Sequence, residues 1–233
     1  MVFGELGELP ISENIKTRML CFWSKLVSDN NNKISSMLYR LLYTMDRENM
    51  FSSNWIITVK NLLNNCGFTE YWTNQSFPNS LNWFKETVKQ RINDQYVQTW
   101  NDNVFHSGKC TNYRMFKTRF AFENYLVTLP LKYRRSFTRF RCRNHKLPIE
   151  TDAYKDIARR LRFCRLCGLN KRGDEFHYIF VCEYLKKERK EFITHNSNGL
   201  ASSQTMCDLF NNNNSNKTIA LCKFIDIIVK QFK

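Results

Sequence analysis

The sequence lacks any long apolar run. No stretch approaches the roughly 18–20 consecutive apolar residues that cross a bilayer, and no charged segment followed by an apolar one opens the chain. The nine cysteines are odd in number and spread over 233 residues, which argues against the disulfide framework of a small secreted protein. These absences predict a protein of the nucleus or cytoplasm with no membrane partner.

Strand signals are also few, and no tandem repeat is apparent. Apolar residues instead recur every three or four positions, most clearly from Leu81 to Val104, so the sequence predicts a mainly α-helical fold. The stretch from Gly4 to Pro10, which holds two glycines and one proline, predicts an extended lead-in. We expect a helical scaffold over 1–108, a basic helical segment over 109–163, a zinc knuckle with its following helix over 164–195, and C-terminal helices over 196–233.

Positive charge is concentrated in the middle of the chain. The net charge is +15, and residues 109–165 hold sixteen basic side chains against four acidic ones. Residues 1–108 hold ten of each. Such a bias indicates an anionic partner, although it does not determine the fold.

A helix after Pro130 would organise part of this charge. At about 100° per residue, Arg135, Arg139 and Arg143 share one face, and an aromatic face lies apart from them. Stacked arginines repel one another unless an anion lies opposite. Phosphate groups would offset this repulsion. A solvated basic face, or pairing of the arginines with acidic side chains of the N-terminal half, stays open as the alternative. The candidate phosphate contacts are Arg135, Arg139, Arg143, Arg159, Arg160, Arg162 and Arg165, and the candidate base-stacking rings are Tyr113, Phe116 and Phe120.

A compact metal motif follows, Cys164-x2-Cys167-x9-His177-x4-Cys182. Three thiolates and one imidazole at this spacing are typical of a Cys3His zinc knuckle, and four protein ligands leave no coordination position for a substrate. We therefore predict a structural zinc site. Three ordinary buried cysteines and a core histidine are the alternative.

Details of the motif predict its local structure. Gly168 suits a tight turn with positive φ, and Asp174 suits the N-cap of the next helix. The five-residue step from His177 to Cys182 turns about 140° beyond one full turn of a regular α-helix, so we expect a distorted helix start. Cys142 and His145 form a weaker pair, interpreted as a core thiol and a surface imidazole.

No catalytic constellation is visible. A Tyr/Phe-x-Asp-Asp sequence is absent, and no acid or base is spaced to orient a histidine next to a nucleophile. We expect a binding protein without catalytic residues or a small-molecule substrate. A helical scaffold that binds another protein is the alternative function.

Several short motifs carry a family resemblance. Leu147-Pro148-Ile149-Glu150, Arg159-Arg160, the cysteine–histidine motif with Gly173-Asp174-Glu175, and Glu188-Arg189 resemble the C-terminal region of non-LTR (LINE-type) retrotransposon reverse-transcriptase polyproteins. The aromatic and basic motifs around Tyr113-Arg114 and Phe122-Glu123 resemble the same region. The resemblance implies an accessory segment, following the polymerase domain, that grips template RNA or target DNA. The residues themselves favour single-stranded or structured RNA over sequence-specific duplex readout, because no recognition-helix pattern stands out and the mix of basic and aromatic side chains suits splayed bases.

Overall fold

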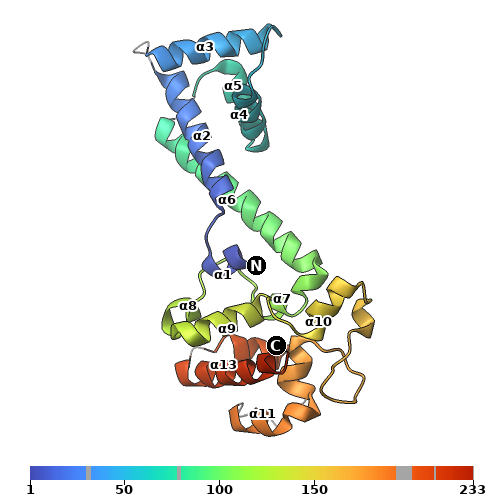
Figure 1. The fold of residues 1–233 in the computed structure, drawn as a ribbon. Coiled ribbons are helices and arrows are strands. Elements are labelled where there is room, and N and C mark those ends of the chain that lie inside the picture. The colour runs from blue at the N-terminus through green and yellow to red at the C-terminus, as the bar shows by residue number, and fades with distance from the viewer. Residues whose placement is uncertain (30–32, 78–79, 193–200, 213, 233) are drawn as a thin grey trace. The chain divides into compact units, whose positions relative to one another are not determined.

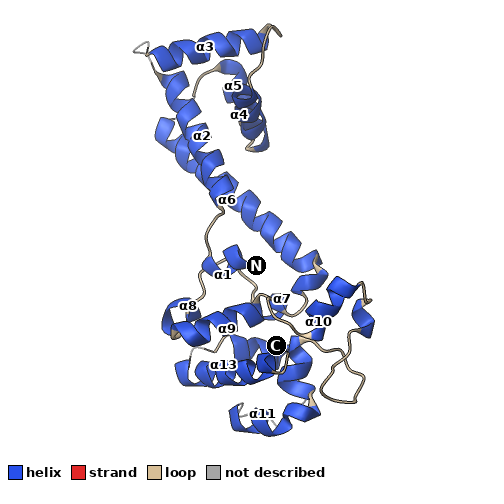
Figure 2. Ribbon diagram, viewed as in Figure 1, coloured by secondary structure: helices blue, strands red, loops and turns tan. Residues whose placement is uncertain are grey.

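The computed structural model describes residues 1–29, 33–77, 80–192, 201–212 and 214–232. Within these ranges the chain is helical and has no β-strand (Figure 2); two isolated β-bridges join Leu6 to Phe122 and Phe163 to Arg172. The prediction of a mainly α-helical fold is confirmed. Among the helices so described, none combines the length and the apolar character needed to span a membrane.

The chain divides into two compact units, and the long helix α6 (Leu81–His106) contributes to both. We call Glu8–Trp100 the aromatic unit, and Met1–Gly7 together with Asn101–Lys233 the basic unit. Besides α6, the aromatic unit contains α2 (Ile11–Ser28), α3 (Ile34–Arg47), α4 (Asn54–Asn65) and α5 (Thr69–Asn74).

The helices of the basic unit are shorter. They are α1 (Val2–Leu6), α7 (Tyr113–Phe116), α8 (Tyr125–Thr128), α9 (Leu131–Arg141), α10 (Pro148–Thr151), α11 (Lys186–Phe192), α12 (Ser203–Phe210) and α13 (Ser215–Lys230). Between them lie the 3-10 turns η1 (Gly108–Cys110), η2 (Asp152–Lys155), η3 (Arg159–Leu161) and η5 (Glu183–Leu185), and the π-helical turn η4 (His177–Val181).

The aromatic unit is built around its ring side chains. Helix α4 packs against α2, α3 and α5 (Figure 1). Ser53 begins α4 by accepting a hydrogen bond from the backbone of Ile56, and Gly67, with φ of 71°, follows its end. Trp23 is fully buried in the core and its Nε1 donates to the hydroxyl of Tyr39 at 2.8 Å. The polar edges of these rings are therefore satisfied inside the core.

The basic unit has its core around α9, α12 and α13. Helix α13 packs along α9 and also contacts α11 and α12 (Figure 1). Phe210 of α12 stacks on Phe116 at 4.7 Å and on Phe137 at 5.4 Å between ring centroids. This stack joins α7, α9 and α12 into one core.

The lead-in predicted from Gly4 to Pro10 is wrong in its first half, because residues Val2–Leu6 form helix α1. Glu5 is 1% exposed, and its carboxylate accepts from Arg141 Nε at 3.0 Å and from the Tyr125 hydroxyl at 2.6 Å. A buried carboxylate with such partners holds the segment in place. Gly7 then has φ of 62°, and a Cβ there would lie 2.4 Å from the backbone nitrogen of Phe122, so only glycine fits.

The predicted helix over the stacked arginines also ends early. Helix α9 stops at Arg141, Cys142 caps it, and Arg143 takes a left-handed backbone with φ of 54°. Arg135 and Arg139 therefore share a helix, but Arg143 does not continue their row. The extension to Arg143 was wrong because hydrophobic periodicity gives no sign of a helix end without glycine or proline.

Candidate metal centre and nucleic-acid interface

The first two metal-ligand candidates lie on a tight hairpin. Its stem pairs Phe163 with Arg172, and the Cys164 nitrogen donates to the Lys171 carbonyl at 2.8 Å. Gly173 closes the stem; a Cβ there would lie 2.9 Å from the Tyr178 hydroxyl oxygen and 3.1 Å from a backbone oxygen. The positive φ predicted at Gly168 is wrong. Asn170 supplies it instead, with φ of 47°, a conformation that asparagine tolerates well.

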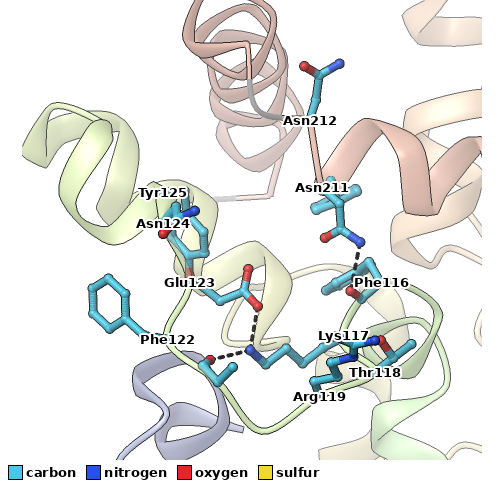
Figure 3. Close-up of a pocket in the computed structure, with 12 residues that line it drawn as sticks. Phe116, Lys117, Thr118, Arg119, Phe122, Glu123, Asn124, Tyr125, Asn211 and Asn212 are labelled. Atoms are coloured by element: carbon cyan, nitrogen blue, oxygen red, sulfur yellow. Dashed lines mark hydrogen bonds and ion pairs between the residues drawn. The ribbon is translucent and has the colours of Figure 1, made fainter.

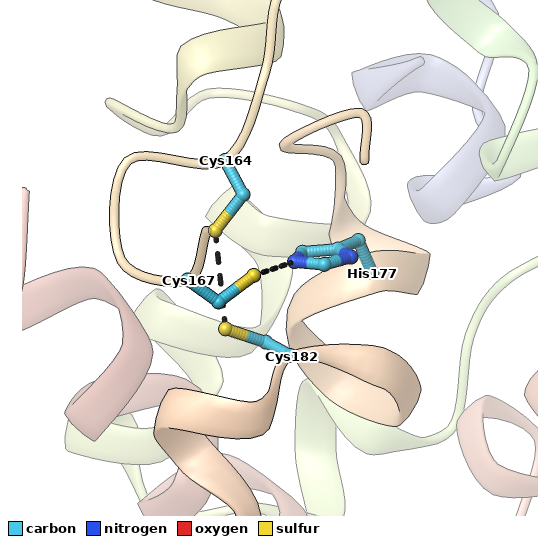
Figure 4. Close-up of side chains that lie close together, drawn as sticks. All are labelled: Cys164, Cys167, His177 and Cys182. Carbon is cyan, nitrogen blue, oxygen red and sulfur yellow. Dashed lines mark hydrogen bonds between the residues drawn. The ribbon is translucent and has the colours of Figure 1, made fainter. Parts of the chain in front are cut away.

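The other two ligand candidates lie on the helical segment after the hairpin. The Asp174 carboxylate accepts from the His177 nitrogen at 2.9 Å, which confirms the predicted N-cap. The chain then makes the π-helical turn η4, in which the Cys182 nitrogen donates to the His177 carbonyl at 2.8 Å. This wider turn, closed over five residues, is the expected distortion. It brings His177 and Cys182 to the same side of the segment (Figure 4).

The four side chains converge on one point. One ligand atom from each of Cys164, Cys167, His177 and Cys182 lies within 4.8 Å of the other three. The sulfurs of Cys164 and Cys182 are 3.9 Å apart, and the Cys167 sulfur is 3.3 Å from His177 Nε2 (Figure 4). A tetrahedral ion with metal–sulfur bonds of about 2.3 Å would separate its sulfurs by about 3.8 Å. The group can therefore hold a metal ion.

The electrostatics of the group favour a cation. Burial would raise the pKa of Cys164, but hydrogen bonds to the sulfur, from His177 and from the backbone of Leu166 among others, outweigh it and lower that pKa. Burial, together with the neighbouring Cys164 thiolate, raises the pKa of Cys182. One thiolate thus forms readily and a second is resisted by like charge. A divalent cation between the sulfurs would remove that resistance.

The surroundings of the group are closed. Cys182 is fully buried and His177 is 3% exposed. Arg189 donates to the carbonyls of Ile179 at 2.6 Å and of Cys182 at 2.7 Å, so it ties α11 to the end of the π turn. His177 Nδ1 is buried without a hydrogen-bond partner among the described residues. The ring is instead held by its edge contact with Tyr178. Four protein ligands in such a place fit a structural ion.

Several of the arginines predicted as phosphate contacts are bound by other groups of the protein. Arg143 is 4% exposed and forms ion pairs with Glu150 and, at 3.1 Å, with Glu175. Arg162 donates to the carbonyls of Ile157 and Ile149, both at 2.8 Å. Arg165 is exposed but forms an ion pair with the buried Asp152. These three side chains hold the basic unit together.

The other four candidate arginines form no ion pair within the described residues. Arg135, Arg139 and Arg160 are exposed and form no ion pair or side-chain hydrogen bond within the described residues. Arg159 is half-buried, and its guanidinium donates to the Gly108 carbonyl. Arg135 and Arg139 lie one turn apart on α9, a helix that has no acidic residue of its own. Fewer arginines therefore contribute to the exposed cationic surface than the sequence predicts.

The candidate stacking rings are placed mainly inside. Tyr113 is fully buried and Phe116 is 4% exposed, and both belong to the core of the basic unit. Phe120 is half-buried. Of the three, only Phe120 is more than marginally exposed.

Sequence reasoning missed a buried polar cluster that positions the metal group. Glu175, 2% exposed, accepts from Asn112 Nδ2 at 2.5 Å and lies 2.8 Å from His145 Nε2. The His145 side chain is therefore interior, and its interpretation as a surface imidazole was wrong. Interaction with His145, and with Arg143, lowers the pKa of Glu175 to about 2 despite its burial. The one feature of the sequence that could have indicated this cluster was the position of Glu175 directly after the N-cap Asp174.

Comparison with known proteins adds no family. No family model, no curated protein and no solved structure matches this chain.

Proposed function

We propose that the protein is a zinc-stabilised nucleic-acid-binding module that grips RNA, or single-stranded or target DNA, through the basic unit. It acts by binding and supplies no catalytic residues. On the motifs that resemble LINE-type polyproteins, we further propose that it serves a retroelement reverse transcriptase as an accessory segment. The ion is zinc because three thiolates and one imidazole are the ligands that structural zinc takes in proteins.

The observation that carries this proposal is the pair Arg135 and Arg139. Both side chains are exposed on α9, and neither forms an ion pair with a carboxylate of the described residues. Two like charges one helical turn apart repel each other, and a phosphate backbone offsets that repulsion. Arginine also suits phosphate because its planar group donates two parallel hydrogen bonds.

Salt dependence of binding tests the proposal. With about four phosphate contacts, the plot of log affinity against log salt concentration should fall with a slope of about −3 on single strands and about −4 on duplex DNA. Filter binding of the full chain over a range of salt measures this slope. Negligible affinity for RNA and DNA at every ionic strength would refute the proposed function.

Metal content is tested independently. Native mass spectrometry should find one zinc per chain, and Cys167→Ser should lose it because the site then has only three ligands. Cys207→Ser is the matched control, since Cys207 is half-buried in the same unit and outside the metal group. Loss of zinc from both variants would argue against the assigned ligands.

One observation favours the alternative, a protein-binding scaffold with a structural zinc. The exposed face of α3 carries four large apolar side chains at helical spacing, Ile34, Met37, Leu38 and Leu41, each at least 54% exposed. If nuclease-treated protein binds no nucleic acid while Leu38→Glu changes its sedimentation, the scaffold function is favoured.

A further inference from the structure

A cavity lies in the basic unit, away from the metal group. Its volume is about 280 Å³. One wall is the loop from Phe116 to Tyr125, and the other is formed by residues 210–212 at the end of α12 (Figure 3). Small-ligand pockets have volumes of about 300–1,000 Å³, so this cavity suits a single ring-sized group.

The apolar part of the lining is preorganised. Phe116 and Phe210 are each 4% exposed and stack nearly parallel, with an interplanar angle of 12°. Tyr125 is held by its hydroxyl, which donates to buried Glu5 at 2.6 Å. These rings do not need to rearrange to receive a ligand, so binding would cost little ordering.

A buried ammonium group lies at the cavity. Lys117 is 3% exposed, and its Nζ donates to the Ala121 carbonyl at 2.6 Å and to Glu123 Oε1 at 2.5 Å (Figure 3). The other oxygen of Glu123 is 3.2 Å from Arg141 Nη2. A lysine has three N–H donors, so one donor of this fixed charge has no acceptor among the described residues. A ligand oxygen would supply one.

Two amide side chains complete the polar lining. Asn211 Nδ2 donates to the Phe116 carbonyl at 3.0 Å, which fixes the amide and leaves its Oδ1 as an acceptor (Figure 3). Asn124 is exposed and its side chain forms no hydrogen bond within the described residues. The cavity therefore offers a charged donor, an oriented acceptor and a free amide. A ring carbonyl next to a ring N–H is the complementary edge.

We propose that this cavity receives one unpaired base bearing a ring carbonyl beside a ring N–H, namely uracil, thymine or guanine, from a bound single strand. Lys117 donates to the base carbonyl and Asn211 Oδ1 accepts from the base N–H. The Asn124 amide, which can donate or accept, forms a hydrogen bond with the next polar atom of the same base edge. Proteins recognise splayed-out bases in this way, through hydrogen bonds to the base edge within an aromatic pocket. This inference rests on the proposed function.

The mouth of the cavity can hold the phosphate of the same nucleotide. Arg119 lines the cavity, is exposed, and forms no ion pair within the described residues. Its guanidinium contributes backbone affinity that is independent of the base. Base recognition and phosphate binding can therefore be separated experimentally.

The test alters the ligand first, so that folding is not disturbed. The affinity of the full chain is measured by fluorescence anisotropy for three RNA strands of equal length, carrying uracil, N3-methyluracil or no bases. The uracil strand should bind about tenfold more tightly than the abasic one. N3-methylation removes the N–H donor but keeps the ring, so that strand should bind about three- to fivefold more weakly than the uracil strand.

A protein variant then tests the location. Asn124→Ala should weaken binding of the uracil strand about three- to fivefold and leave the abasic strand unchanged, because one hydrogen bond to the base is lost. Asn103→Ala is the matched control, an exposed asparagine of the same unit that lies outside the cavity, and it should change neither affinity.

The outcomes distinguish the two proposals. Equal affinity for all three strands, unchanged by Asn124→Ala, overturns the base pocket and leaves the nucleic-acid-binding function standing. Failure to bind any strand at low salt overturns the proposed function, and the base pocket with it.

Discussion

The two units of this protein solve the same folding problem with different chemistry. Among the described residues, the aromatic unit buries only Ser24 and Ser36 as polar side chains. The basic unit buries many more, namely Glu5, Asn112, Lys117, Arg141, Arg143, Glu150, Asp152, Glu175, His177, Arg189 and Thr218. Apolar burial is tolerant of small errors, whereas a buried charge is costly unless its partner is present. The basic unit is therefore expected to be more sensitive to single changes.

The two units also differ in charge, and the unit that buries more polar side chains carries the larger positive excess. The aromatic unit has ten basic and eight acidic residues, and the basic unit has twenty-six and thirteen. Part of the basic charge is used inside, where Arg141 and Arg143 are paired with glutamates. Exposed side chains that form no ion pair within the described residues, such as Arg135 and Arg139, can attract anions. One composition bias thus serves both folding and recognition.

Metal removal should give the largest difference in response between the two units. Structural zinc contributes about 10–16 kcal/mol in zinc-finger peptides, which is as large as the whole stability of a typical domain. A chelator should therefore unfold the basic unit and lower the far-UV circular dichroism signal. All five tryptophans lie in the aromatic unit, so tryptophan fluorescence should stay at its native value. A simultaneous change in both signals would show that the two units do not unfold independently.

The buried pair of Arg141 and Glu5 should give the next largest effect. Arg141→Met leaves the Glu5 carboxylate, 1% exposed, without its cation, and breaking such a pair costs about 3–5 kcal/mol. Urea denaturation followed by far-UV circular dichroism measures the loss. The double variant Glu5→Gln/Arg141→Met should recover part of it. Arg139→Met, exposed on the same helix, is the control and should change stability by less than about 0.5 kcal/mol.

The aromatic unit should respond to a cavity in its core. Leu63 of α4 is fully buried, and Leu63→Ala should cost about 2–5 kcal/mol through lost burial and the void left behind. Tryptophan fluorescence in urea reports this loss, and the zinc content should stay unchanged. Ile57→Ala on the same helix is the control, because Ile57 is 43% exposed. A loss of zinc from Leu63→Ala would mean that the two units do not fold separately.

The helical fold and the metal group were predictable because both depend on local spacing. The period of three to four residues marked α6, and the cysteine and histidine spacing marked the metal ligands together with their distorted helix start. Asp174 could be assigned as an N-cap from its position alone.

The ionic partners could not be predicted because they are distant in sequence. Glu5 and Arg141 are 136 residues apart, and Glu175 meets Arg143 across the metal hairpin. The sequence left open that acidic side chains neutralise the arginines, but it did not indicate which arginines are neutralised. For the same reason, Tyr113 and Phe116 could not be distinguished from surface rings until α12 was seen to cover them.

Removal of the two exposed arginines of α9 should change stability least and nucleic-acid binding most clearly. The double variant Arg135→Ala/Arg139→Ala removes two exposed charges, so its stability should stay within about 0.5 kcal/mol of the parent. On a single strand, each lost phosphate contact reduces the magnitude of the slope of log affinity against log salt concentration by about 0.7. Loss of two contacts should therefore make the slope shallower by about 1.4. Arg18→Ala/Lys25→Ala is the matched control, since both side chains are exposed on α2 of the aromatic unit. If both double variants change the slope equally, binding follows total charge and is not localised to α9.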